Sequence, residues 1–229
     1  MEKKAIKYIA ALSLLSVVFS LASCKKDEVN LDLQHDYFGL KEKAFVEYKV
    51  TYMFHDSLLG KHDTINYFIK TVVADTVLDN LGRVAQKFYR YQRKDNTKPW
   101  VVKDLWSAII VDNRAELVEE NQRVVKLVFI PTEDKVWDMN AFNGLGKQEV
   151  TYSGIGESRS YNGLNFGETV TVEQEDFTTL IDRRRAYEVY AKGVGMVYKV
   201  QRDLKYKFGS PKPIKGEEYF YEVVNFGVQ

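Results

Sequence analysis

The chain has 229 residues, with 33 basic and 32 acidic side chains and a formal net charge of +1. This balance argues against nucleic-acid binding, which needs a basic patch, and against a polybasic membrane-surface role. One cysteine excludes an intrachain disulfide, and four prolines without any low-complexity tract indicate a single domain without a linker.

The start of the chain predicts a cleaved export signal, residues 1–23. Lys3, Lys4 and Lys7 form a positively charged start, and the stretch 8–21 has no charged side chain. This apolar run has the length found in signal peptides and is shorter than the roughly 20 residues that span a bilayer. A buried core helix is the alternative, but such a helix would carry polar residues at a helical period, which this run lacks.

The end of this run carries a more specific signal. Leu21, Ala22 and Ser23 precede Cys24, and together they resemble the lipobox of bacterial lipoproteins. The resemblance implies that Cys24 becomes the first mature residue and that its thiol receives a diacylglyceryl group. Several acyl chains, at about 0.8 kcal/mol per buried CH2, would hold the protein in a membrane permanently. Ordinary signal cleavage beside an incidental cysteine is the alternative.

The three charged residues Lys26, Asp27 and Glu28 follow the cysteine closely. They are similar to the export tag of Gram-negative surface lipoproteins, which implies an outer-membrane protein exposed on the cell surface. The alternative is a charged, solvated tether on a protein that faces the periplasm. The expected organisation is therefore a signal peptide at 1–23, a lipidated cysteine and tether at 24–38, and one β-rich domain at 39–229.

Alternating apolar and polar residues predict strands along this domain. Residues 45–54 place Val46, Tyr48 and Val50 on one side and Glu47 and Lys49 on the other. Further strands are expected at 64–77, 83–93, 100–111, 124–130, 149–152, 168–175, 196–208 and 218–226.

Two stretches are ambiguous. Residues 114–121 could form a short helix or the first half of a hairpin that continues at 124–130, and we favour the hairpin. Residues 137–146 are rich in Asn and Gly and predict a packed loop or a single helical turn.

The connections between these eight to ten segments are too short for crossover helices, which makes the strands antiparallel. The expected fold is mainly β: an antiparallel, strongly bent sheet or partly closed barrel with few short helices. A two-layer β-sandwich is the alternative.

The segment 190–198, Tyr-Ala-Lys-Gly-Val-Gly-Met-Val-Tyr, carries a second resemblance. It is similar to a turn and strand in a family of β-rich bacterial envelope lipoproteins without an established activity. The stretches 63–67, 98–101 and 126–129 look like pieces of the same family. The resemblance implies an all-β fold and no activity.

The sequence offers only weak candidates for a metal site or a phosphate-binding loop. Each of the three histidines, His35, His55 and His62, precedes an aspartate. Imidazole and carboxylate suit a metal, but the spacing matches no zinc motif and Asp is common in turns, so we favour turns and expect no metal or cofactor. The glycines at 193 and 195 lead into a strand, which indicates a turn rather than a phosphate-binding loop.

The aromatic residues are the remaining candidates for binding, since they make up 14 % of the chain. Trp100, Trp106 and Trp137 lie in or beside predicted loops, where they could stack on a sugar or line an apolar pocket. Filling the core is the alternative, and we favour it.

The sequence therefore predicts a non-catalytic outer-membrane or surface lipoprotein that acts by binding or as envelope structure. A carrier of a glycan or a lipophilic ligand on the concave face of the sheet is the second interpretation. A hydrolase with a carboxylate pair, for example among Glu173, Glu175 and Asp176 or at Glu119 and Glu120, is the third, and chance pairs are expected among so many acids.

Overall fold

The computed structural model describes residues 31–229, and Leu33–Gln229 form one compact unit. The predicted signal peptide, the lipid attachment at Cys24 and the export tag Lys26–Glu28 lie outside the described residues.

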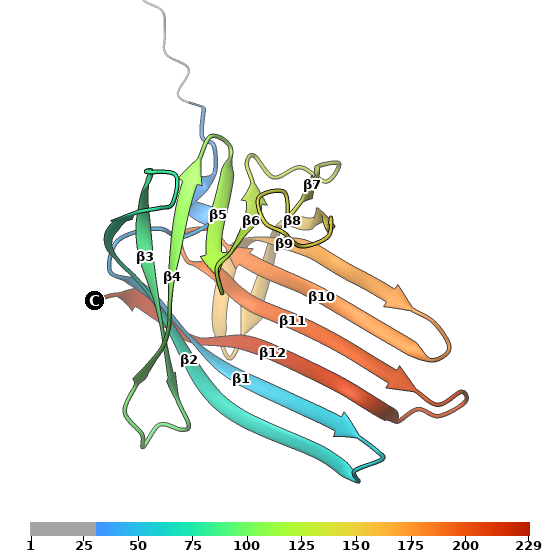
Figure 1. Cartoon of the computed structure of the whole chain (residues 1–229). Helices are drawn as coiled ribbons and strands as arrows, with labels where there is room; N and C mark the ends of the chain where they lie inside the picture. Colours follow the sequence, from blue (N-terminus) through green and yellow to red (C-terminus); the bar gives the residue numbers. More distant parts are fainter. Residues whose placement is uncertain (1–30) are drawn as a thin grey trace, which may run out of the picture. The chain divides into compact units, whose positions relative to one another are not determined.

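The unit is built from one antiparallel sheet of twelve strands (Figure 1). Across the sheet the strands follow the order β6-β5-β4-β3-β2-β1-β12-β11-β10-β9-β8-β7. Their bounds are β1 Ala44–Asp56, β2 Lys61–Leu78, β3 Val84–Arg93, β4 Val101–Val111, β5 Arg114–Glu119, β6 Gln122–Val128, β7 Val136–Asp138, β8 Glu149–Tyr161, β9 Leu164–Thr178, β10 Asp182–Ala191, β11 Gly195–Tyr206 and β12 Pro213–Val228. Among the described residues, the single helix is the 3-10 turn His35–Tyr37.

The sheet curls until its two edges meet. Val125 of β6 donates its backbone N–H to the carbonyl of Met139, just after β7, at 2.9 Å. The indole Nε1 of Trp137 donates to the carbonyl of Val125 at 3.0 Å. The hydroxyl of Tyr152 accepts from Val128 N and donates to Val128 O. These few bonds replace a full ladder, so the mainly-β, partly closed barrel is confirmed, and the sandwich is wrong because one continuous sheet forms both walls.

The alternation in β1 explains which face turns inward. Val46, Tyr48 and Val50 are buried, whereas Lys49 is exposed, as period-two patterning predicts. Two buried clusters fill the unit. One contains Leu117, Leu127, Val150, Val170 and Tyr190; the other contains Tyr48, Val50, Ile69, Val189 and Val223.

The favoured hairpin at 114–130 is confirmed by β5 and β6, which are joined at Glu120 and Asn121 with positive φ at both residues. The strands at 149–152 and 168–175 are longer than expected, since β8 and β9 form one hairpin with its turn at Asn162–Gly163. The tip of that hairpin lies against β12, where Asn162 Nδ2 donates to Val223 O at 2.9 Å. Tyr161 of the same hairpin stacks on Tyr198 of β11, with ring centroids 4.7 Å apart.

The chain enters the unit beside the β10–β11 turn. Tyr37 and Phe38 are buried in the core, so packing begins a few residues before the predicted domain start at 39. Gly193 donates its N–H to Asp36 O at 3.0 Å. Gly39 has φ +65°, and a Cβ there would lie 2.5 Å from Val194 O, so only glycine permits this close approach. None of the helices in residues 31–229 has the length and apolar character needed to cross a membrane.

Candidate functional site

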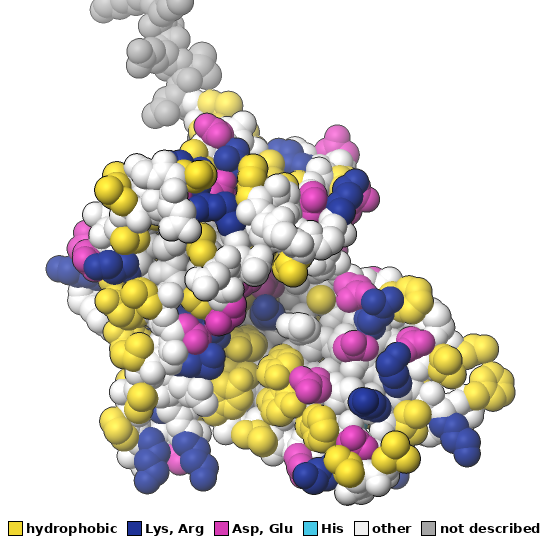
Figure 2. Space-filling view, in the orientation of Figure 1, with side chains coloured by type: hydrophobic (Ala, Val, Ile, Leu, Met, Phe, Trp, Pro, Cys, Tyr) yellow, Lys and Arg dark blue, Asp and Glu magenta, His cyan; other side chains and the backbone are white. Residues whose placement is uncertain are grey.

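A cavity with about 90 Å³ of free volume lies inside the curled sheet. Its walls are mostly apolar, and they come from β1 to β6, from β10 to β12 and from the entry segment. The lining residues that matter below are Val73, Phe88, Arg90, Trp106, Glu119, Lys126, Glu188, Tyr190, Met196, Lys199 and Tyr221. Figure 2 shows this side of the molecule hollowed, with hydrophobic side chains gathered in and below the hollow and charged ones beside them.

Strand register brings these residues together. Arg90 of β3 lies opposite Thr71 of β2 and opposite Asp104 of β4. Two residues earlier in β3, Phe88 lies opposite Trp106 of β4. Because directly opposed residues share one face of an antiparallel pair, these pairs line the same wall.

A buried ion cluster forms one side of the cavity. Glu188 Oε1 lies 2.9 Å from Lys126 Nζ and 3.2 Å from Lys199 Nζ. The hydroxyl of Tyr190 donates to Glu188 Oε2 at 2.7 Å. Glu119 Oε1 lies farther from Lys126 Nζ, at 3.8 Å. Glu188 is 1 % exposed, so these partners substitute for the water that a charged carboxylate requires.

Electrostatics fixes the protonation of this cluster at neutral pH. Burial alone would raise the pKa of Glu188, but the charges of Lys126 and Lys199 and the bond from Tyr190 hold it well below its usual range. Burial would lower the pKa of Lys126, and the charges of Glu119 and Glu188 raise it instead. Burial and the Glu188 charge raise the pKa of Tyr190. The cluster therefore contains a carboxylate, ammonium groups and a neutral hydroxyl donor.

A second polar group lies across the cavity. Arg90 Nη1 donates to Asp104 Oδ2 at 2.7 Å, and its guanidinium lies 4.0 Å above the ring of Trp106. Each of the cations Arg90, Lys126 and Lys199 thus has an anionic partner among Asp104, Glu119 and Glu188, and Asp104 also pairs with Lys103 at 2.9 Å. Since these charges compensate one another, the cavity does not call for a charged ligand.

Trp106 leaves one hydrogen-bonding group unused. Its indole Nε1 is buried and donates to no acceptor among the described residues, although a buried N–H normally finds one. A ligand with an apolar body would match the walls of the cavity.

The structure separates the three tryptophans that the sequence suggests for binding. Trp106 lines the cavity. Trp137 is buried and joins the sheet edges, so core filling is confirmed for this residue. Trp100 lies just before β4, with the Arg93 guanidinium 4.2 Å above its ring.

The histidines lie outside the cavity. His55 and His62 face each other across β1 and β2, with their Nδ1 atoms 3.1 Å apart. Asp56 accepts from the N–H groups of Leu58 and Leu59, so its predicted role in a turn is confirmed. Within residues 31–229, no group of three or more His, Cys, Asp or Glu side chains is arranged to hold a metal ion. His35 does not join this pair, and its ring packs against the edge of Phe129.

The suggested hydrolase carboxylates are engaged with cations on β10. Glu173 pairs with Arg185 at 2.6 Å and accepts from Ser153 Oγ. Glu175 pairs with Arg184 at 2.8 Å, and Asp176 lies 3.8 Å from Arg185.

Sequence reasoning missed the residues that shape the cavity, among them Arg90, Lys126 and Glu188. Each lies in a strand where a charged residue normally marks the solvent face. A charge between apolar neighbours, as in the run Val124 to Phe129, is the one signal that could have indicated Lys126.

The position of the lipoprotein-like segment 190–198 is also informative. Tyr190 belongs to the ion cluster, and Val194, Gly195 and Met196 line the cavity. No family model, curated protein or solved structure matches the chain, so the family suggested by this segment stays a prediction.

Proposed function

We propose that this chain is a non-catalytic lipoprotein of the bacterial outer membrane, fixed through Cys24, whose β domain binds an uncharged lipophilic molecule inside the sheet. The observation that carries the binding role is the cavity: apolar walls enclose free space beside an ion cluster that is already neutralised. The cavity matches typical ligand sites in its apolar walls and few polar groups, and its free volume of about 90 Å³ admits only a small molecule.

The anchor rests on the sequence. The apolar run, Leu21-Ala22-Ser23 and Cys24 favour lipidation, and Lys26-Asp27-Glu28 favours the cell surface over the periplasmic side. Palmitate labelling of cells should mark the mature protein, and Cys24→Ala should abolish the label and release the chain from the membrane fraction. Protease treatment of intact cells should digest the domain if it is surface-exposed. An unlabelled wild-type chain would refute the anchor.

The binding role is tested with a short-chain alcohol that bears a diazirine, an uncharged photoreactive probe small enough for the cavity, added to membranes that contain the full chain. After illumination and digestion, adducts should map to cavity residues such as Phe88, Trp106 and Met196. Adducts found only outside the cavity would refute the carrier function.

Two neighbouring valines provide a matched blocking experiment. Val73 lines the cavity, whereas Val72 points to the opposite face of β2. Val73→Phe fills free space and should lower cavity adducts about tenfold, and Val72→Phe should leave them unchanged. Urea unfolding of both variants confirms that each is folded. Equal labelling of the two folded variants would contradict the proposal.

A further inference from the structure

Three hairpin tips meet at one end of the sheet. Ser57, after β1, donates its N–H to Ile214 O in β12 at 2.8 Å. Tyr206, at the end of β11, donates its N–H to Ile181 O in the β9–β10 loop at 2.7 Å. The segments 57–61, 179–183 and 205–215 therefore form one continuous surface, which we call the tip surface. Figure 1 shows the three tips side by side at lower right.

The tip surface exposes large apolar side chains. Leu58 is 98 % exposed, Leu180 is 76 % exposed and Phe208 is 73 % exposed. Leu59, Ile181 and Ile214 are exposed beside them. Single exposed apolar residues are ordinary, but a set shared by three adjacent tips indicates a contact surface.

The same segments are strongly basic. They contain Lys61, Arg183, Lys205, Lys207, Lys212 and Lys215, and their single acid is Asp182. Asp56, at the end of β1, adds a second acid that lies directly opposite Lys61 and Lys215. Asp182 is paired with Lys205 at 2.8 Å. Six cations against Asp182 and the neighbouring Asp56 leave the tip surface with an excess of positive charge, in a chain whose formal net charge is +1.

We propose that the tip surface docks onto an anionic lipid surface. The leucine, isoleucine and phenylalanine side chains would enter the boundary between headgroups and acyl chains, and the lysines would reach the phosphates. Apolar tips combined with Lys and Arg are the composition that binds such an interface.

Charge complementarity selects lipid over the other occupants. A second copy of the chain would bring two basic tip surfaces together, and like charges repel. Nucleic acid would match the charge but would leave the apolar side chains without partners. An anionic bilayer satisfies both kinds of side chain.

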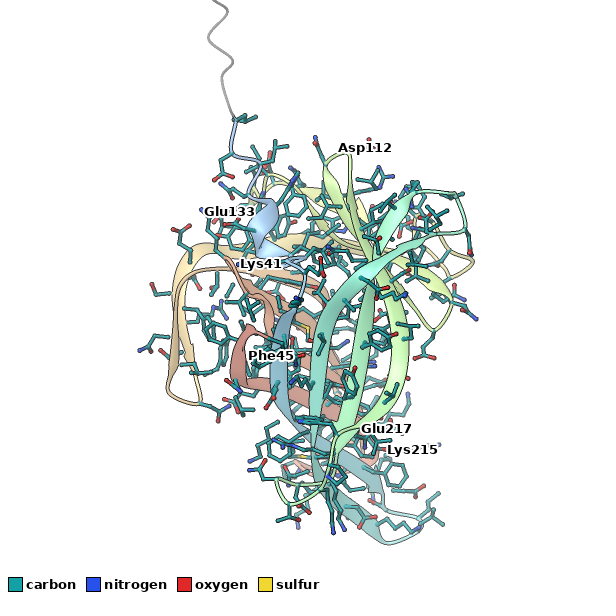
Figure 3. All side chains as sticks on the ribbon, turned by 90° about the vertical axis from the view of Figure 1, so that its left-hand side faces the viewer. Lys41, Phe45, Asp112, Glu133, Lys215 and Glu217 are labelled. Atoms are coloured by element: carbon teal, nitrogen blue, oxygen red, sulfur yellow. The ribbon has the colours of Figure 1, made fainter. Side chains whose placement is uncertain are left out.

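The tip surface lies away from the segment at which the described chain enters the unit. The entry segment packs on the β10–β11 turn, at the other end of β10 and β11 from the tips. Figure 3 shows the same polarity, with Lys215 and Glu217 at one end of the sheet and Asp112 of the β4–β5 turn at the other.

Tryptophan reporters test the proposal. Leu58→Trp and Phe208→Trp place an indole on the tip surface, and Leu81→Trp is the matched control. Leu81 is 69 % exposed in the β2–β3 loop, at the other end of β2. The full chain, kept in phosphatidylcholine nanodiscs if it carries a lipid, is mixed with vesicles whose acyl chains are brominated. Quenching beyond that of the unsubstituted chain is measured.

In phosphatidylglycerol vesicles, the indoles at 58 and 208 should be quenched at least about twofold more than the indole at 81. In phosphatidylcholine vesicles this difference should disappear. Equal quenching of all three variants, or a difference that is independent of lipid charge, would overturn the proposal.

Paired lysine substitutions test the charge contribution. Lys207→Gln with Lys212→Gln should weaken vesicle binding about tenfold. The control, Lys94→Gln with Lys98→Gln, changes two exposed lysines of the β3–β4 loop and should leave binding unchanged. Both pairs of substitutions remove two positive charges. An equal loss of vesicle binding in the two variants would therefore show a non-specific electrostatic effect and would contradict docking through the tips.

Discussion

Two buried glutamates in this domain are bound by different kinds of side chain. Glu188 and Glu116 are each 1 % exposed, and both have a pKa below the ordinary range despite burial. Glu188 faces the cavity and is held by two lysines and a tyrosine hydroxyl. Glu116 is held by Arg83, Arg114 and Arg123 at 2.6 to 2.7 Å.

The partners of Glu116 extend outward to the β2–β3 loop. Arg83 and Arg123 also bind Asp79, at 2.8 and 3.1 Å. Their planar guanidinium groups tie a loop to the β5–β6 hairpin by several directed bonds. Lysines make point contacts instead, and those on Glu188 border free space. The comparison indicates that the Glu116 network fixes structure, whereas the Glu188 cluster borders the cavity.

The largest expected effect follows from removing Glu188. Glu188→Ala leaves Lys126 buried without its closest carboxylate, and the expected loss in free energy of unfolding is about 3–5 kcal/mol. Urea denaturation measures it. Glu188→Gln is the control, since it preserves shape and a hydrogen-bonding oxygen and should lose less. A loss below about 1 kcal/mol for Glu188→Ala would contradict the described cluster.

Removing Glu116 should have a smaller effect. Its arginine partners are partly exposed and retain Asp79 and Asp112 as acceptors. We therefore expect Glu116→Ala to lower the free energy of unfolding by about 1–3 kcal/mol. If Glu116→Ala destabilised the protein more than Glu188→Ala, the contrast between the two sites would be wrong.

The dependence of the free energy of unfolding on acidic pH tests the Glu116 network further. Burial alone would raise the pKa of Asp79, but hydrogen bonds from Arg83 and from backbone N–H groups lower it from 3.8 to about 2. A carboxylate with a depressed pKa stabilises the fold above its unfolded pKa, and this contribution disappears as the pH falls through the folded value. As the pH falls from 3.8 to about 2, the free energy of unfolding should decline, and it should decline less steeply in Asp79→Asn than in the unsubstituted protein. Identical slopes in the two proteins would exclude this contribution.

The smallest effect is expected for one arginine of the network. Arg114→Gln leaves Glu116 bound to Arg83 and Arg123, so the loss should be about 1 kcal/mol or less. Thermal unfolding with Arg83→Gln as the comparison variant checks this, because Arg83 binds both Glu116 and Asp79. Loss of cooperative unfolding in Arg114→Gln would show that the network is not redundant.

Much of the sheet could be predicted from local patterns. The alternation at 45–54 predicts β1, and the turn residues near 80 and 95 separate β2, β3 and β4 correctly. In contrast, the sequence did not predict β10, because this strand begins with Asp182 and three arginines. These residues lie opposite residues of β9 on one side and of β11 on the other. Periodicity detects a strand only where one face is apolar, and these residues are polar on both.

The sequence by itself determined an antiparallel β domain and its short turns, because these depend on neighbours within a few residues, and on the same local basis it predicts a lipoprotein-like leader. Only the tertiary structure decided that Lys126 is buried, since its partner Glu188 lies 62 positions along the chain and across the barrel interior. The same holds for the cavity and for the tip surface. Each arises from side chains that meet only after the sheet has curled, and no local pattern encodes how far a sheet will curl.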